Sequence, residues 1–301
     1  MSSFDEVSQE WLIRFLEHRI GDRRIIRLIR KWLKAGVLED GIVTVSDQGT
    51  AQGAVISPLL ANLYLHYVLD LWAERWRRQE ATGDMVIVRY ADDFIVGFQH
   101  EADARRFLGA MHERLGKFAL SLHPQKTRLI EFGRFAAENR KRRGLGKPET
   151  FNFLGMTFIC GRSKRGKFLI RRKSRGDRMR AKVREIKTEL RRRMHQSIPE
   201  QGKWLRQVIT GYFNYHAVPM NSRALDLFRH RIIVHWRRML RHRSHTATMP
   251  WTRMRQLVTD LLPKPRPLHP WPSARFAVTH PRWEPYARIG HVRFCAGGAQ
   301  Q

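Results

Sequence analysis

The sequence predicts an α+β fold, in which an antiparallel sheet with packed helices is followed by an α-helical region. Two observations support this prediction. Apolar stretches typical of strands lie at residues 86–98 and 151–172, and apolar residues at helical spacing surround them. From Arg178 onward the pattern is mostly helical. With 301 residues, 42% of them hydrophobic, the chain can build a packed core.

The first elements follow from apolar spacing and from helix-start signals. Residues 9–34 fit two amphipathic helices broken near Gly21. A long helix is expected from Ser57 and Pro58, because serine is a good N-cap and proline a good first helical residue. Apolar residues recur at helical spacing in 107–115, which predicts another helix. The apolar residues that the long helix should bury are Leu59, Leu60, Leu63 and Leu69.

The second half begins with a hairpin and a change of composition. Residues 151–172 predict two short strands around a turn in "GRSKRG". Between Arg162 and Arg193 there are sixteen Lys or Arg and three acidic residues, a density that suits either a solvated surface or a polyanion site. Residues 204–240 predict helices, and the prolines of 262–272 predict an extended connector. Rings that could pack in the core or stack on bases are Trp204, Tyr212, Phe213, Tyr215 and Trp236.

The net charge points to an anionic partner. The chain has 57 Lys and Arg against 27 Asp and Glu, which gives a formal charge of +30 and a pI of about 11.4. It has no apolar run of the ~20 residues that span a bilayer, so nucleic acid is favoured over a membrane. The first residues do not resemble a secretory signal. Two distant cysteines exclude a disulfide framework and a paired-cysteine zinc site, which suits a cytoplasmic, nucleoid-associated or ribonucleoprotein-associated protein.

The candidate chemistry lies in "VIVRYADDFIVGF", residues 86–98, where Asp92 and Asp93 interrupt an apolar stretch. One interpretation is a hairpin turn, since aspartate is a common turn residue. The other is a Mg²⁺ site, because two ionised carboxylates in an apolar hairpin repel each other unless a cation or hydrogen-bond donors compensate them. Mg²⁺ prefers such oxygen ligands together with water and phosphate oxygens.

Four motifs follow one another along the chain: "QGAVISP" (52–58), "YADD" (90–93), "LSLHPQKTRLIEF" (120–132) and "FNFLGMTF" (151–158). In type and order they resemble the motifs of reverse transcriptases. Further similarity, at residues 14–41 and 205–218, is to bacterial group II intron-encoded proteins with a thumb and a maturase domain X. The resemblance implies a partial palm with primer-grip hairpin at 1–173, a thumb and domain X at 174–260, and a Pro-rich connector and basic C-terminal tail at 261–301.

The resemblance also implies roles for individual residues. Asp92 would be a ligand of the catalytic Mg²⁺ and Asp93 a weaker or indirect one, while Lys126 would neutralise or protonate the pyrophosphate leaving group. Tyr90, Gln52 and Gly53 would lie near the primer end, the incoming nucleotide and the template. Leu154 and Gly155 would form the primer grip. The expected RNA-binding residues are Arg171, Arg172, Lys173, Arg178, Arg180 and Lys182.

The sequence departs from the family at its start. The family's first catalytic aspartate would fall two positions before Met1, the family's usual aromatic residue is replaced by Ser3, and the fingers would lie further upstream. Asp5 is a poor substitute ligand, because six residues displace it from the metal. An upstream fragment that supplies the fingers and this aspartate is therefore an expected partner. No paired cysteines support an additional nuclease domain.

Three functions remain open at this point. The first is an RNA-directed DNA polymerase and intron maturase, whose partners would be group II intron RNA, an RNA template with a DNA primer, and deoxynucleoside triphosphates. The second is a catalytically inactive remnant that only binds intron RNA through its basic thumb and domain X. The third is an unrelated basic DNA-binding protein in which "ADD" is a turn.

Overall fold

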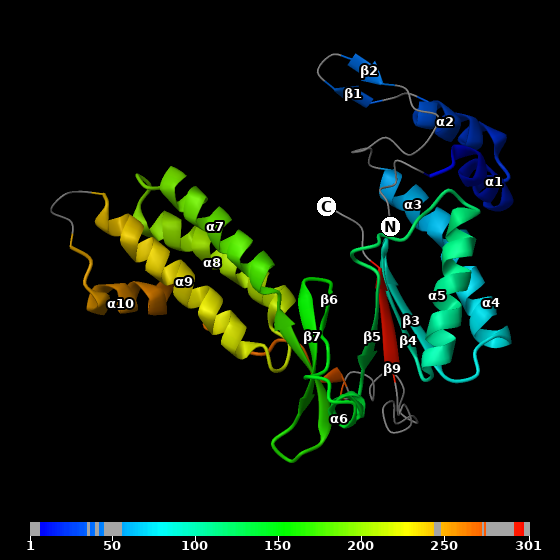
Figure 1. Cartoon of the computed structure of the whole chain (residues 1–301). Coiled ribbons are helices and arrows are strands. Elements are labelled where there is room, and N and C mark those ends of the chain that lie inside the picture. Colours follow the sequence, from blue (N-terminus) through cyan, green and yellow to red (C-terminus); the bar gives the residue numbers. More distant parts are fainter. Residues whose placement is uncertain are drawn as a thin grey trace. The chain divides into compact units, whose positions relative to one another are not determined.

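A computed structural model describes residues 7–34, 37–39, 42–44, 56–243, 248–272, 274 and 292–297. The chain divides into two compact units (Figure 1). The first unit comprises Met1–Glu149 and Ile289–Gln301, and the second comprises Thr150–Arg288. No helix among the described residues is long and apolar enough to cross a membrane.

The helices that the sequence predicts in the first unit are present close to their expected positions, and a further short helix, α6, follows β5. The expected break near Gly21 separates α1 from α2, and a π-helical segment, His66–Asp70, joins α3 to α4. The helices are α1 (Gln9–Arg19), α2 (Arg23–Lys34), α3 (Ser57–Leu65), α4 (Leu71–Gln79), α5 (Glu101–Gly116) and α6 (Ala136–Arg142).

The start of α3 differs in detail from the prediction. Ser57 is its first helical residue, and the N-cap position belongs to Ile56, which makes no side-chain capping bond. Leu60 and Leu69 are buried as predicted, but Leu59 is 66% exposed. Residues on neighbouring positions of a helix point about 100° apart, so Leu59 does not share the face of Leu60.

The main sheet of the first unit joins distant segments of the chain. Its strands are β3 (Met85–Tyr90), β4 (Asp93–Phe98), β5 (Arg128–Phe132) and β9 (Val292–Gly297), in the order β3-β4-β9-β5. Strand β9 is antiparallel to β4 and to β5, so these two strands run parallel with one strand between them (Figure 1). Helix α5 makes the crossover between them. A separate short pair consists of β1 (Val37–Glu39) and β2 (Ile42–Thr44).

Strand β9 corrects the expected role of the C-terminal tail. Residues 261–301 were expected to form a connector and a tail, yet Val292–Gly297 pairs with five residues of β4 and five of β5. The physical reason is that parallel strands β4 and β5 leave backbone donors and acceptors that need a partner between them.

The core of the first unit lies between α5, the α3–α4 helix and the sheet. Strand β4 is buried along most of its length, whereas the edge strand β3 alternates between buried and exposed residues. That alternation fits an edge strand with one solvated face. The core includes Tyr64, Val68, Leu69, Phe94, Val96, Phe98, Phe107, Met111 and Leu115.

The second unit combines a three-stranded sheet with helices. Residues 151–174 form three strands rather than two, with order β6-β7-β8 and antiparallel pairing throughout. The sheet belongs to the helical unit, so the unit boundary falls at Glu149 instead of the expected residue 173. The elements are β6 (Phe151–Phe153), β7 (Met156–Arg162), β8 (Phe168–Ser174), α7 (Gly176–Arg192), α8 (Ile198–His216), α9 (Ser222–Arg241) and α10 (Trp251–Leu261).

Hydrogen bonds at the end of β8 explain why the sheet stays with the helices. The amide of Ser174 donates to Oδ1 of Asn221 at 3.0 Å, and Nδ2 of Asn221 donates to Oγ of Ser174 at 2.8 Å. Both residues are buried. Because buried polar groups need partners, these bonds fix the sheet to the start of α9.

Candidate functional site

The two adjacent carboxylates lie at the turn of the β3–β4 hairpin. Tyr90 pairs with Asp93, which leaves Ala91 and Asp92 as a two-residue turn. The expected hairpin is therefore confirmed. Ala91 has a φ of 53°, in the left-handed region that costs a residue with a Cβ roughly 1–2 kcal/mol. A strained turn of this kind persists only where its surroundings hold it.

Arg89 holds this turn against the long helix. Its guanidinium donates to both carboxylate oxygens of Asp70, at 2.7 and 2.6 Å. It also donates through Nη1 to Oδ1 of Asn62 at 2.9 Å and to the carbonyl oxygen of Ala91 at 2.7 Å. The Arg89 side chain is only 16% exposed, so these bonds are partly shielded from water. The planar fork of arginine suits bidentate contact with a carboxylate.

Asp70, the partner of Arg89, is the last residue of the π-helical segment. This segment is itself supported from α5, where Arg114 donates to the carbonyl oxygens of Val68 and Tyr67 at 3.1 and 3.2 Å. Burial lowers the pKa of Arg114, which nonetheless remains charged at neutral pH. The turn with Asp92 is thus connected through two arginines to two helices.

The structure describes the positions of only some of the other residues expected at the site. Lys126 lies in the turn that precedes β5, and because β4 and β5 are parallel, it lies at the same edge of the sheet as Asp93. Tyr90 is 66% exposed at the end of β3. Gln52 and Gly53 lie outside the described residues.

The two carboxylates at the turn fit Mg²⁺ only if water and substrate phosphates complete its coordination. Within the described ranges, no group of three or more His, Cys, Asp or Glu side chains is placed to hold a metal. The carboxylates of Asp92 and Asp93 alone do not make a closed metal cage. Mg²⁺ is usually bound by one or two carboxylates together with water and substrate phosphates, and the Asp92–Asp93 pair fits that mode.

A second two-residue turn lies between β6 and β7 in the second unit. Leu154 and Gly155 have φ values of 46° and 70°, the pattern of the type I′ turn that suits a tight hairpin. The hydroxyl of Tyr215 donates to the carbonyl oxygen of Leu154 at 2.8 Å. Arg175 donates its amide to the carbonyl oxygen of Gly155 at 3.0 Å. Tyr215, one of the rings that could stack on bases, therefore bonds to the expected primer-grip turn.

The expected RNA-binding residues lie on β8 and α7. Arg171 and Lys173 on β8 are exposed, as are Arg178 and Arg180 on α7, while Arg172 and Lys182 are half-buried. Lys182 pairs with Glu185 at 2.6 Å. Two of the other rings that could stack on bases belong to the core of this unit: Trp236 is fully buried, and Tyr212 stacks on Phe228 with ring centroids 3.7 Å apart.

Sequence reasoning missed the residues that hold the two turns. Arg89 carried a signal, because it is a charged residue inside an apolar strand and directly precedes "YADD". Asp70 carried none, since nothing in its surrounding sequence indicates a partner 19 positions away. Tyr215 was recognised as an aromatic candidate, but its bond to Leu154 depends on a contact across 61 positions.

Comparison with known proteins assigns the chain to a family. The model of the family described as reverse transcriptase (RNA-dependent DNA polymerase) matches residues 1–158, slightly more than half of the chain. The chain belongs to the reverse transcriptase family. The match includes both turns and Lys126.

Relatives include intron-encoded proteins. The chain is 44% identical over 72 residues to the group II intron-encoded protein LtrA of Lactococcus lactis, covering 23% of this chain and 12% of LtrA. It is 46% identical over 76 residues to an uncharacterized 91 kDa protein in the cob intron of Schizosaccharomyces pombe, covering 25% and 9%. It is 28% identical over 202 residues to protein YkfC of Escherichia coli, covering 56% and 48%. The chain thus matches less than half the length of each of these relatives.

Proposed function

We propose that the protein is an RNA-directed DNA polymerase and intron RNA maturase of a group II intron, with the Asp92–Asp93 turn as its nucleotidyl-transfer site. The observation that supports this most directly is the turn itself. It presents two adjacent carboxylates at the tip of a hairpin, in a chain of the reverse transcriptase family, and Arg89 fixes its backbone.

The chemistry assigns distinct tasks to the residues. The oxygen of a primer 3′-hydroxyl attacks the α-phosphorus of a deoxynucleoside triphosphate, and the bond to pyrophosphate breaks. Divalent ions such as Mg²⁺, when bound, stabilise the attacking and leaving oxygens. Asp92 and Asp93 supply carboxylate ligands, and the bonds of Arg89 keep them in position. Lys126 offers an ammonium group to the departing pyrophosphate at the same sheet edge.

The second unit supplies the proposed nucleic-acid contacts. Leu154 and Gly155 form a tight turn that would contact the primer. The basic side chains of β8 and α7 would neutralise phosphates of intron RNA or of the template, since each such contact releases counterions. The residues with this role are Arg171, Arg172, Lys173, Arg178, Arg180 and Lys182.

One observation favours a second candidate, a protein that binds intron RNA without catalysis. The described residues place only two acidic side chains at the turn and no third metal-binding group beside them. A further carboxylate, where one is needed, would come from outside the described residues. The RNA-binding surface of the second unit would not depend on it.

Primer extension distinguishes the two candidates. The full chain is incubated with an RNA template, a DNA primer, nucleotides and Mg²⁺, beside Asp92→Asn and the matched acidic control Glu74→Gln. Extension that Asp92→Asn abolishes and Glu74→Gln retains supports the polymerase. Tight RNA binding without extension supports the second candidate, and the absence of both activities contradicts both.

A further inference from the structure

A cavity of about 370 Å³ lies between α7 and α9 in the second unit. Its floor is apolar, formed by the buried side chains of Leu190 and Met239 and by the half-buried Met194. All its other lining residues are basic: Lys187, Arg191, His235, Arg238 and His242. No carboxylate lines it.

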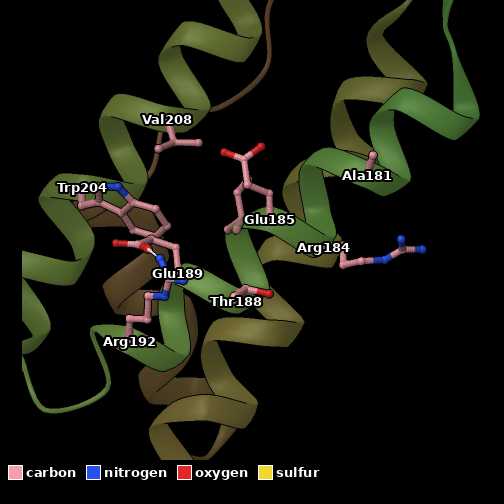
Figure 2. A pocket seen from close by; sticks show the side chains of 9 residues that line it. Ala181, Arg184, Glu185, Thr188, Glu189, Arg192, Trp204 and Val208 are labelled. Atoms are coloured by element: carbon pink, nitrogen blue, oxygen red, sulfur yellow. Dashed lines mark ion pairs between the residues drawn. The ribbon is translucent and has the colours of Figure 1, made fainter. Parts of the chain in front are cut away.

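The opposite side of α7 shows that this composition is not simply a property of a basic helix. A cavity of about 660 Å³ between α7 and α8 is lined by Glu185 and Glu189 as well as by arginines. Figure 2 shows Glu185 and Glu189 beside Val208 and Trp204 of α8. Glu189 pairs with Arg193 at 2.8 Å and with Arg192 at 3.7 Å. The positive charge on this side is therefore largely compensated.

The cations of the α7–α9 cavity lack such compensation. Among the described residues, Lys187, Arg191 and Arg238 take part in no salt bridge, and all three are exposed. Like charges held close together raise the electrostatic free energy of the free protein, and an anion would lower it. An uncompensated basic cavity therefore favours an anionic ligand.

We propose that the α7–α9 cavity is a binding site for the phosphodiester backbone of RNA, in which Lys187, Arg191 and Arg238 contact phosphate oxygens and His235 becomes protonated on binding. This inference rests on the proposed RNA binding by the second unit, and it locates one contact on a surface that includes α9. The apolar floor lets the stems of the long side chains pack while their charged ends reach the phosphate.

His235 makes the site sensitive to pH. Burial lowers its pKa, and the charges of Lys187, Arg238 and Arg231 lower it further, so the ring is neutral in the free protein at pH 7. The titratable groups that line the cavity from α7, α9 and the residues directly after them are Lys187, Arg191, His235, Arg238 and His242. A bound phosphate opposes the field of these cations and raises the pKa of His235. Proton uptake then accompanies RNA binding, and affinity increases as the pH falls.

Two matched triple variants of the full chain test the location. Lys187→Gln/Arg191→Gln/Arg238→Gln removes three charges from the cavity, while Arg184→Gln/Arg192→Gln/Arg223→Gln removes three from exposed positions elsewhere on the same helices. Binding of a labelled RNA stem-loop is measured across a salt series. Each lost phosphate contact should weaken binding about 4- to 5-fold at about 0.15 M salt and reduce the salt slope by about 0.7–0.9.

The cavity variant should therefore bind RNA roughly 60- to 125-fold more weakly than the wild type, for three contacts, and the control variant much less so. Equal losses in the two variants would mean non-specific electrostatics and would overturn the site, although the proposed RNA binding would stand. A wild-type chain that does not bind the stem-loop would overturn the site and the RNA-binding part of the proposed function together. Circular dichroism verifies that both variants are folded.

The pH dependence tests His235 independently. Between about pH 8 and pH 5.5, wild-type affinity should rise by at most about tenfold per pH unit, the limit for uptake of one proton. His235→Gln should flatten this rise, while the exposed control His230→Gln on the same helix should keep it. Equal pH slopes for the two variants would contradict a protonation of His235 coupled to binding. A stem-loop of DNA bound as tightly as RNA would assign the site to nucleic acid in general and overturn its assignment to RNA.

Discussion

The four-stranded sheet of the first unit and the three-stranded sheet of the second each present a two-residue turn, but they are assembled in different ways. In the second unit, β6, β7 and β8 follow one another along the chain and pair in sequence order. In the first unit, β9 comes from the end of the chain and lies between β4 and β5. The carboxylate-bearing turn therefore depends on contacts between distant segments, whereas the Leu154–Gly155 turn belongs to a local sheet.

The hydrogen bonds that hold the two turns also differ in number and in charge. The Ala91 carbonyl accepts from a charged guanidinium that also binds Asp70 and Asn62, so four bonds share one side chain. The Leu154 carbonyl accepts a single neutral bond from Tyr215, whose side chain is largely exposed. The Gly155 carbonyl accepts a second neutral bond, from the amide of Arg175. The charge-assisted network of Arg89 should hold its turn more rigidly than these two neutral bonds hold theirs.

Deletion of residues 289–301 should produce the largest loss of stability, and it should affect the sheet of the first unit but not that of the second. Among the described strands, β5 pairs only with β9, so the deletion leaves β5 without a partner and exposes an edge of β4. With five residue pairs lost on each side, we expect hydrogen-exchange protection of β4 and β5 to fall by about 3 kcal/mol or more, since backbone bonds contribute about 0.5–1.5 kcal/mol each. Protection of β6, β7 and β8 should be unchanged.

The matched control is deletion of residues 298–301, which leaves β9 intact. This shorter deletion should retain protection of β4 and β5. Full protection in the longer deletion would show that β9 does not complete the sheet in solution, and the comparison between a non-local and a local sheet would fail.

The next largest effect concerns the side chains that hold the turns. Arg89→Met leaves Asp70 without its bidentate partner and should reduce the local stability of β3 and β4 by about 1–3 kcal/mol. Tyr215→Phe removes one partly exposed neutral bond and should cost the β6–β7 hairpin about 0.5–1 kcal/mol. Arg78→Met, which breaks an exposed pair with Glu74, should cost about 0–1 kcal/mol. Local hydrogen exchange measures all three, and equal effects of Arg89→Met and Arg78→Met would contradict the role given to Arg89.

A further difference between the two units concerns their acid sensitivity. Burial lowers the pKa of His216 to about 4. Because the folded pKa lies below the unfolded one, the second unit should lose stability as the pH falls from about 6.5 towards about 4. His216→Gln should remove part of this dependence in hydrogen exchange of α8.

The first unit should respond at lower pH. Burial would raise the pKa of Asp103, but hydrogen bonds from Arg106, Thr82 and Gly83 outweigh it and lower the pKa below its usual 3.8. The stability that this carboxylate contributes is present above that value and is lost only below it. Loss of protection in both units over the same pH range would contradict this difference.

The sequence predicted what depends on local pattern. The β3–β4 hairpin followed from apolar residues on both sides of "ADD", and α1, α2 and α5 followed from helical spacing. Strand β9 was missed because its partners β4 and β5 lie about 200 and about 160 positions earlier and nothing in its six residues specifies them. Arg89 stands out as a charge inside an apolar strand, but nothing in the sequence indicates Asp70, 19 positions away, as its partner. Of the expected site, the structure places Lys126 at the sheet edge of Asp93, and the roles of these residues remain predictions.

The central claim is that Asp92 and Asp93 bind divalent metal together with nucleic-acid substrates. The most direct measurement is a Mn²⁺ titration of the full chain, followed by electron paramagnetic resonance, with an RNA template, a DNA primer and a deoxynucleoside triphosphate present. We predict that the wild type and Glu74→Gln take up more Mn²⁺ than the double variant Asp92→Asn/Asp93→Asn, because the amides are much poorer ligands for a hard cation. Equal uptake by the wild type and the double variant would contradict the claim.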